Sequence, residues 1–216
     1  MSSGLLRRLA DKSITKEELI RKVKQNFDLL PEILEGTSSS KPAVRYGCAK
    51  VLIDLSEECP EKLYSYMDSF IDLLGSKHRI LTWNALAIIA NLARVDVDKK
   101  FDAIFDKYYG FLNDAYMVTV ANVVGNSSNI ALAKPYLINR ITNELLKVEN
   151  LSVTPHLTEE CKRVLAEKTI ESFDAFFDRI HNKDIVLSFA TKYADSSRKT
   201  LKVKAENFLR KWIPRQ

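Results

Sequence analysis

The chain has few of the residues on which several protein classes depend. Its three cysteines, Cys48, Cys59 and Cys161, are odd in number and show no C-x-x-C spacing, which argues against a disulfide framework or a cysteine zinc site. Only six glycines and six prolines occur among 216 residues. That composition favours helices joined by short turns over many short strands.

Motifs for catalysis and for metal binding are also missing. The three histidines, His78, His156 and His181, lie near predicted turns and none has a metal-ligand spacing. No glycine-rich phosphate loop, G-x-S-x-G sequence or Cys–His pairing is present. We therefore predict no catalytic residue, no metal site and no cofactor, and expect the protein not to be an enzyme.

Long apolar runs do not occur. The longest uninterrupted one, residues 85–90, is far shorter than the roughly 20 residues that span a bilayer. The N-terminus has charges at Arg7, Arg8, Asp11 and Lys12 and lacks the apolar core of a secretory signal. These observations predict a cytoplasmic protein with no membrane partner.

The charge is unevenly distributed along the chain. The net charge is +5, but from Lys192 onward there are eight basic residues and two acidic ones, so the preceding part is close to neutral. Any electrostatic attraction to a partner therefore concerns the C-terminal end. Hydrophobic residues make up 46% of the chain and charged residues 28%, which indicates a folded protein with a core.

One helical pattern recurs along the chain. Its apolar residues follow i, i+4, i+7, i+8, i+11, the spacing of one helix face. The first copy has Val44, Cys48, Val51, Leu52 and Leu55; the second has Leu81, Ala85, Ile88, Ile89 and Leu92; the third has Tyr116, Val120, Val123 and Val124, with Ser127 at the last position. Because no single copy can bury its apolar face alone, neighbouring copies must stack.

Polar residues mark the same position in each copy. Asp54, Asn91 and Asn126 lie 37 and 35 residues apart, and Ser172 holds the next position after 46 residues. Such an interval between equivalent helices indicates an α-solenoid. The longer last interval places an insertion at 149–158, with a polar loop around Pro155 and a new helix beginning after Thr158.

The remaining pattern supplies the partner helices. Thr15 and Glu18 have capping-box spacing, Pro31 bends or restarts the first helix, and residues 36–42 form the clearest loop. We predict a poorly ordered N-terminal segment, 1–14, and a single repeat domain, 15–216, with about five antiparallel helix pairs and no strand. The predicted helices span 43–58, 61–74, 80–94, 101–112, 117–125, 135–148, 159–180, 184–193 and 198–212.

The segments 29–34 and 44–55 resemble the HEAT and armadillo repeats. In that pattern a proline-bearing first helix, here with Pro31, is followed by a second helix that opens with Val-Arg, here Val44-Arg45. The second copy replaces that pair with Leu81-Thr82. The resemblance covers roughly residues 15–212 and implies a right-handed α-α superhelix, a short HEAT-like solenoid. It also implies a scaffold whose concave face, lined by the second helices, grips another protein.

The polar row is the first candidate site. Asp54, Asn84, Asn91, Asn122 and Asn126 would form a ladder of donors and acceptors, because equivalent residues of stacked helices lie about 8–10 Å apart. Armadillo proteins use an asparagine ladder on extended peptides, so the resemblance implies the same use here. The alternative is that these side chains bond one another or cap neighbouring turns.

Two further candidate surfaces carry aromatic and basic residues. Tyr46 and Trp83 hold equivalent positions, with Val118 in the third copy, and would form either a contact hot spot or filler between helices. The C-terminal basic residues would either bind an acidic partner or nucleic acid, or form the polar outer face of a capping helix. They are Arg198, Lys199, Lys202, Lys204, Arg210, Lys211 and Arg215.

Two functions follow from these features. The first is a non-catalytic scaffold that binds a protein or peptide partner on its concave face. The second is a nucleic-acid-binding HEAT-like protein, in its sharpest form a DNA glycosylase of the alkylation-repair type. For that enzyme Trp83, Trp212 and Asp114 supply the residue types, a carboxylate beside aromatics, without matching the family's motif. The partner and the oligomeric state are left open.

Overall fold

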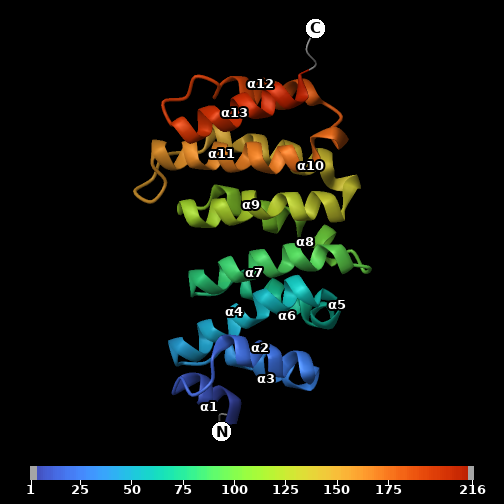
Figure 1. The fold of residues 1–216 in the computed structure, drawn as a ribbon, viewed down its shortest axis with the longest axis vertical. Coiled ribbons are helices and arrows are strands. Elements are labelled where there is room, and N and C mark those ends of the chain that lie inside the picture. The colour runs from blue at the N-terminus through green and yellow to red at the C-terminus, as the bar shows by residue number, and fades with distance from the viewer. Residues whose placement is uncertain (1–3, 214–216) are drawn as a thin grey trace. The chain divides into compact units, whose positions relative to one another are not determined.

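The computed structural model describes residues 4–213, which form two compact units, Met1–Lys100 and Phe101–Gln216 (Figure 1). Within the described residues each unit consists of stacked helices without a β-strand, and only an isolated bridge joins Thr154 and Leu157. The predicted all-α fold class is thereby confirmed. Each unit is described below by itself.

The first unit contains a short N-terminal helix and two repeats. Short 3-10 turns at 27–29, 64–66 and 93–95 connect or extend its helices. The helices are α1 (Gly4–Ala10), α2 (Lys16–Gln25), α3 (Leu30–Gly36), α4 (Pro42–Glu58), α5 (Pro60–Leu63), α6 (Met67–Leu73) and α7 (Arg79–Leu92). Proline occupies the first turn of α3, α4 and α5, where its missing N–H has no intrahelical acceptor to lose.

The second unit contains the remaining repeats. Its 3-10 turns lie at 111–113, 135–137, 147–150 and 177–179. The helices are α8 (Lys100–Gly110), which begins at the boundary, α9 (Met117–Ala133), α10 (Ile138–Leu146), α11 (Glu159–Phe176), α12 (Lys183–Thr191) and α13 (Lys199–Trp212). The insertion 149–158 is the loop that precedes α11, whose N-terminus is capped by the Thr158 side chain.

One helix boundary differs from the sequence-based expectation. The helix expected to end at Gly125 continues to Ala133, because the buried stripe is carried on by Ser127, Ile130 and Ala131. Within the N-terminal segment 1–14 the described residues include α1, whose Leu6 and Leu9 are buried where the helix packs against α3 and α4. Elsewhere the boundaries agree within a few residues.

The repeated apolar stripe is the core of both units. All five stripe residues of α4 and all five of α7 are at most 3% exposed, and α4 packs against α7. In the second unit α11 packs between α9 and α13. Ser127 stands where the stripe of α9 would have a large apolar residue, and its Oγ accepts a 3.1 Å hydrogen bond from the hydroxyl of the buried Tyr109.

Ion pairs join successive repeats at intervals of about one repeat. In the first unit Lys24 pairs with Glu58, and Lys100 Nζ lies 2.5 Å from Asp68. In the second unit Lys134 Nζ lies 2.9 Å from Asp102, and Arg140 lies 2.7 Å from Asp106 while its guanidinium stacks on the Phe105 ring. Two of these pairs, Lys100–Asp68 and Arg140–Asp106, link the first helices of successive repeats.

Candidate functional site

The second helices of the first unit lie parallel and side by side. Near their N-termini the rings of Tyr46 on α4 and His78 before α7 meet edge to face, with 6.4 Å between centroids. Near their C-termini the Asn91 amide donates a 3.0 Å hydrogen bond to Ser56 Oγ. Equivalent positions on α4 and α7 therefore face the same way.

Asp54, the first member of the polar row, is held in ion pairs. Lys16 Nζ and Lys50 Nζ each lie 3.1 Å from one of its carboxylate oxygens. Burial alone would raise the pKa of Asp54, but the hydrogen bonds and charges of the two lysines hold that pKa below its usual value. Its carboxylate is thus occupied by the protein itself.

The two asparagines of α7 differ in their surroundings. Asn91 is tied to Ser56, whose hydroxyl in turn donates to the Ile53 carbonyl at 2.6 Å. Asn84 lies two helical turns before Asn91 and is partly exposed. Its side chain makes no hydrogen bond with any residue that the structure describes. Asn84 therefore keeps its full capacity of two donors and two acceptor lone pairs.

The asparagines of α9 bond back to their own helix. The Nδ2 atoms of Asn122 and Asn126 each donate a 2.8 Å hydrogen bond to the carbonyl four residues earlier. Asn126 also hydrogen-bonds the hydroxyl of the fully buried Tyr108. Asn126 is half-buried and supports a core residue, whereas Asn122 presents its amide oxygen on the helix surface.

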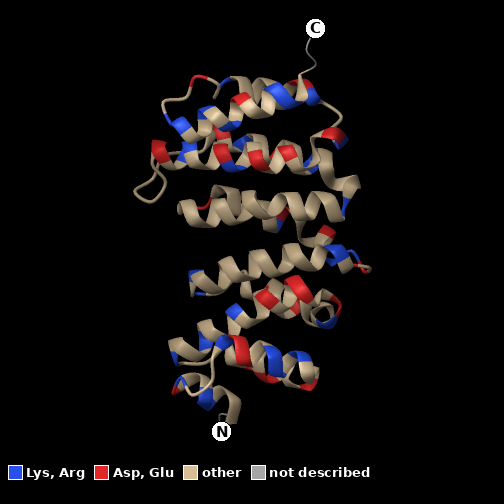
Figure 2. Ribbon diagram, in the orientation of Figure 1, with Lys and Arg blue, Asp and Glu red and all other residues tan. Residues whose placement is uncertain are grey.

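The exposed face of α9 is uncharged along its whole length. The helix has 17 residues without a charged side chain, and Figure 2 draws it tan throughout. A shallow groove of about 480 Å³ runs over this face, lined by Met117, Val118, Ala121, Asn122, Gly125, Asn126 and, from α11, Lys168. Val118 and Leu132 are 44% and 45% exposed near the two ends of the helix.

Gly125 is not required by side-chain packing or by the backbone conformation of α9. A Cβ atom built on it would meet no atom within 4 Å, and its backbone does not have a positive φ. Glycine in a helix interior costs roughly 0.5–1 kcal/mol relative to alanine. Neither packing nor backbone conformation therefore explains why this position on the exposed face lacks a side chain.

The two aromatic candidates lie on the first unit and are both half-buried. Tyr46 carries the Arg45 guanidinium on its ring, with 4.8 Å from the guanidinium carbon to the ring centroid. Trp83 is on the next helix, α7.

The structure surrounds the basic C-terminal residues with carboxylates. Arg198 lies within 2.5 Å and 3.0 Å of Glu160 and Glu167, and Lys204 lies 2.8 Å from Glu171. Lys202 pairs with Asp195 and Glu206, Lys211 with Asp174, and Arg210 donates to Asn207. Lys199 is exposed, and Arg215 lies outside the described residues. The acidic face of α11 thus balances most of the charge of α13.

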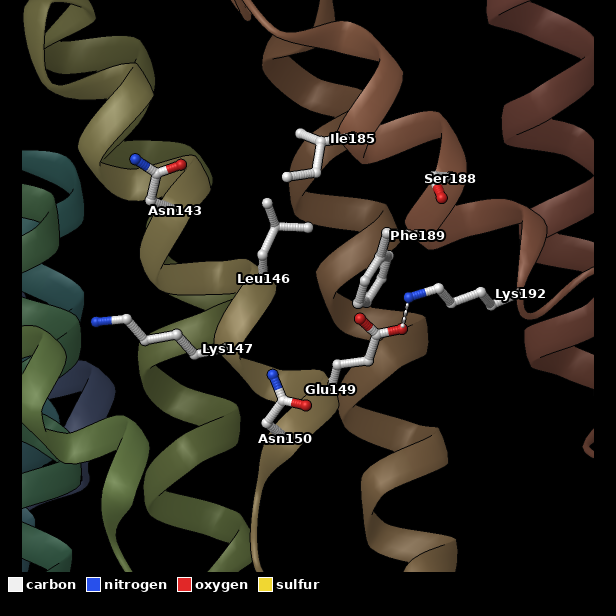
Figure 3. A pocket seen from close by; sticks show the side chains of 9 residues that line it. All are labelled: Asn143, Leu146, Lys147, Glu149, Asn150, Ile185, Ser188, Phe189 and Lys192. Atoms are coloured by element: carbon white, nitrogen blue, oxygen red, sulfur yellow. Dashed lines mark ion pairs between the residues drawn. The ribbon is translucent and has the colours of Figure 1, made fainter.

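Sequence reasoning missed a pocket on the outer helices of the second unit. It lies between the end of α10 and α12 and is lined by Asn143, Leu146, Lys147, Glu149, Asn150, Ile185, Ser188, Phe189 and Lys192 (Figure 3). A 2.8 Å ion pair between Lys192 and Glu149 crosses its mouth. Its residues come from segments 35 or more positions apart, so no local pattern could reveal it.

Trp212 and Asp114, two residues of the glycosylase hypothesis, make contacts within the second unit. No group of three or more histidine, cysteine or acidic residues among those described could hold a metal ion. Trp212 packs on Phe177 and donates from its indole to Asp174 at 2.6 Å, while the Asp114 carboxylate accepts from the Tyr116 N–H at 2.8 Å. No helix among the described residues has the length and apolarity needed to cross a membrane.

The arrangement of stacked helix pairs defines an α-solenoid. Comparison with solved structures shows which kind of α-solenoid fold this is. The chain is similar to a designed armadillo repeat protein in complex with the peptide (KR)4, with a TM-score of 0.66, 17% identity, and coverage of 95% of this chain and 90% of that chain. It is also similar to a second designed armadillo repeat protein, with a TM-score of 0.62, 20% identity and the same coverage.

A third similar structure is that of an engineered protein, with a TM-score of 0.55, 15% identity, and coverage of 95% and 86% of the two chains. Neither the known family models nor the curated protein sequences match this chain. The protein has the armadillo/HEAT-like repeat fold, as the resemblance in its sequence implied.

Proposed function

We propose that the protein is a non-catalytic scaffold that binds an extended, largely uncharged peptide segment of a partner on the exposed faces of its second helices. In the first unit this face is that of α7, with Asn84. In the second unit it is that of α9, where Asn122, Gly125 and Asn129 follow one another between Val118 and Leu132. The observation that carries the proposal is the groove over the uncharged face of α9, in which the exposed Gly125 leaves the helix backbone bare.

The chemistry of these residues suits an extended backbone. An asparagine amide offers both a donor and an acceptor, which match the alternating C=O and N–H groups of a peptide. A glycine on the helix surface lets another backbone approach closely. Val118 and Leu132 add apolar contact at either end of the face, where partner side chains would lie.

The absence of charge on these helices bears on the kind of peptide. A designed protein of similar fold binds the peptide (KR)4. Here α9 has no acidic residue and the only charged residue of α7 is Arg79, so these faces offer no carboxylate to a lysine or arginine. We therefore propose a peptide that is recognised through its backbone and through uncharged side chains.

A nucleic-acid-binding role has less support. Phosphate binding requires cations that are free to replace counterions. The basic residues of α13 are largely engaged with acidic residues of their own unit, which favours a capping helix. Trp212 and Asp114, the glycosylase candidates of this unit, both serve internal hydrogen bonds.

The test is a selection of short linear peptides, displayed on phage, against the full chain. Gly125→Leu is expected to keep or raise the melting temperature, because leucine is a stronger helix former than glycine. We expect it to weaken binding of most selected peptides by about tenfold or more, since such a loss corresponds to about 1.4 kcal/mol of contact.

The matched control is Gly110→Leu. Gly110 is also an exposed helical glycine with open space around it, but it lies on the first helix α8. The Gly110→Leu variant should leave peptide binding unchanged. Asn122→Ala is a second test on the same face, whereas Asn126 is unsuitable because it supports Tyr108. If Gly125→Leu and Gly110→Leu bind the selected peptides equally well, the proposed face is wrong.

A further inference from the structure

The groove over α9 has a second wall, which is formed by α11 and carries a cation. At the helix starts the Met117 N–H donates to the His156 carbonyl at 3.1 Å, and further along the Ser172 hydroxyl donates to the Val124 carbonyl at 2.7 Å. The two helices therefore run side by side in the same direction. Lys168 lies one turn before Ser172, and it is the only charged residue among the described residues that line the groove.

Lys168 differs from the other lysines of the chain that are shielded from solvent. Seven lysines are buried or half-buried, and Lys168 is the one that makes neither an ion pair nor a hydrogen bond with any residue that the structure describes. The other six each have an ion pair of 3.6 Å or shorter. They are Lys16, Lys100, Lys134, Lys162, Lys202 and Lys204.

The acidic residues beside Lys168 on α11 are engaged with the last helix. Glu167 lies 3.0 Å from Arg198, the N-cap residue of α13, and Glu171 lies 2.8 Å from Lys204 on the same helix. Both carboxylates therefore belong to the contact between α11 and α13, whereas Lys168 lines the groove over α9. The ammonium group of Lys168 is left to interact with whatever occupies that groove.

We propose that Lys168 selects an aspartate or glutamate side chain at one internal position of the peptide that binds over α9. This role rests on the proposed function and adds to it the one position at which the peptide is charged. A peptide that covers the groove removes water from the ammonium group, which is costly unless a counter-charge replaces that water. A carboxylate does so through a charge-assisted hydrogen bond from Lys168 Nζ.

The surroundings of Lys168 limit the peptide to a single charge. The face of α9 has no charged side chain, so a second acidic or basic residue of the peptide would lose water there without gaining a partner. Asn122 lines the same groove and offers its amide oxygen to a backbone N–H of the peptide. The expected ligand is thus an extended segment with one acidic residue and uncharged residues on either side of it.

The experiment repeats the phage selection with the wild-type full chain and with Lys168→Met. The library is fused to the coat protein through the C-terminus of the peptide, so that a side chain must supply the carboxylate. We expect an aspartate or glutamate at a fixed position of the peptides selected by the wild type, and no such preference with Lys168→Met. Because Lys168 has no internal partner among the described residues, the variant should keep the wild-type melting temperature.

Synthetic peptides with amidated C-termini measure the size of the effect. Replacing the acidic residue by asparagine or glutamine should weaken binding to the wild type about tenfold and leave binding to Lys168→Met unchanged. Added sodium chloride should weaken binding of the acidic peptide more than that of its amide analogue, because salt screens the ion pair. Lys162→Met is the matched control, since Lys162 is a half-buried lysine of the same helix that pairs with Glu159, and it should leave the tenfold preference intact.

Two sets of variants separate the role of Lys168 from peptide binding itself. If Gly125→Leu weakens binding but the selected peptides show no acidic position that depends on Lys168, the face of α9 binds peptides and the role of Lys168 is wrong. If Gly125→Leu and Gly110→Leu bind the selected peptides equally well, the proposed face is wrong and the role of Lys168 is wrong with it.

Discussion

Phe173→Ala is expected to lower the free energy of unfolding of the second unit by about 3–5 kcal/mol, the usual cost of removing a buried phenylalanine ring. Phe173 is fully buried on α11, the helix that packs between α9 and α13. Its ring meets those of Phe176 and Phe189 edge to face, at 6.1 Å and 5.9 Å between centroids. The substitution therefore opens a cavity where the layers of helices meet.

Urea unfolding followed by tryptophan fluorescence measures this effect. In a Trp83→Phe background the remaining tryptophan, Trp212, reports on the second unit because it packs on Phe177. Ala175→Ser, at an exposed position of the same helix, is the control and should change stability by less than about 0.5 kcal/mol. A cost for Phe173→Ala as small as that of the control would show that α11 is not a central helix.

Asp102→Ala is expected to cost about 3 kcal/mol, because it leaves the charge of Lys134 buried without its counter-charge. The Lys134 side chain is only 4% exposed and its Nζ lies 2.9 Å from Asp102. The Tyr136 hydroxyl bridges the same two side chains, at 3.0 Å from Asp102 and 3.1 Å from Lys134. One hydroxyl does not replace a carboxylate.

The double variant Asp102→Ala, Lys134→Met distinguishes the interaction energy of the Asp102–Lys134 ion pair from the other contacts of the two side chains. Because methionine removes the buried charge and keeps most of the volume, we expect it to recover much of the stability lost in Asp102→Ala. The measurement is the same urea titration, analysed as a double-mutant cycle. Purely additive losses would mean that the ion pair contributes nothing specific.

The fold was largely predictable because the apolar spacing that defines each helix is local in the sequence and recurs from one repeat to the next. The apolar residues of α4 and of α7 follow the same spacing in the sequence, and every residue assigned to these two stripes is buried. The misplaced end of α9 shows the limit of the method. The sequence predicts a helix end at Gly125, whereas the stripe continues beyond it to Ile130, because stacking against α11 outweighs the low helix propensity of one glycine.

The candidate site was predictable only in part, because equivalent positions in a repeat need not have equivalent neighbours. Asp54, Asn91 and Asn126 recur at one place, yet each bonds to something different: two lysines, Ser56 and Tyr108. The balance of charge on α13 could have been found, since Glu160, Glu167, Glu171 and Asp174 share one face of α11.

The most direct test of the proposed function is to map where a selected peptide binds, using backbone and side-chain amide NMR signals of the full chain during a titration. Binding to the second-helix faces predicts that the largest shifts occur at Asn84 on α7 or at Asn122 and Gly125 on α9. Shifts confined to the outer pocket around Ile185 and Lys192, or to the basic helix α13, would contradict it.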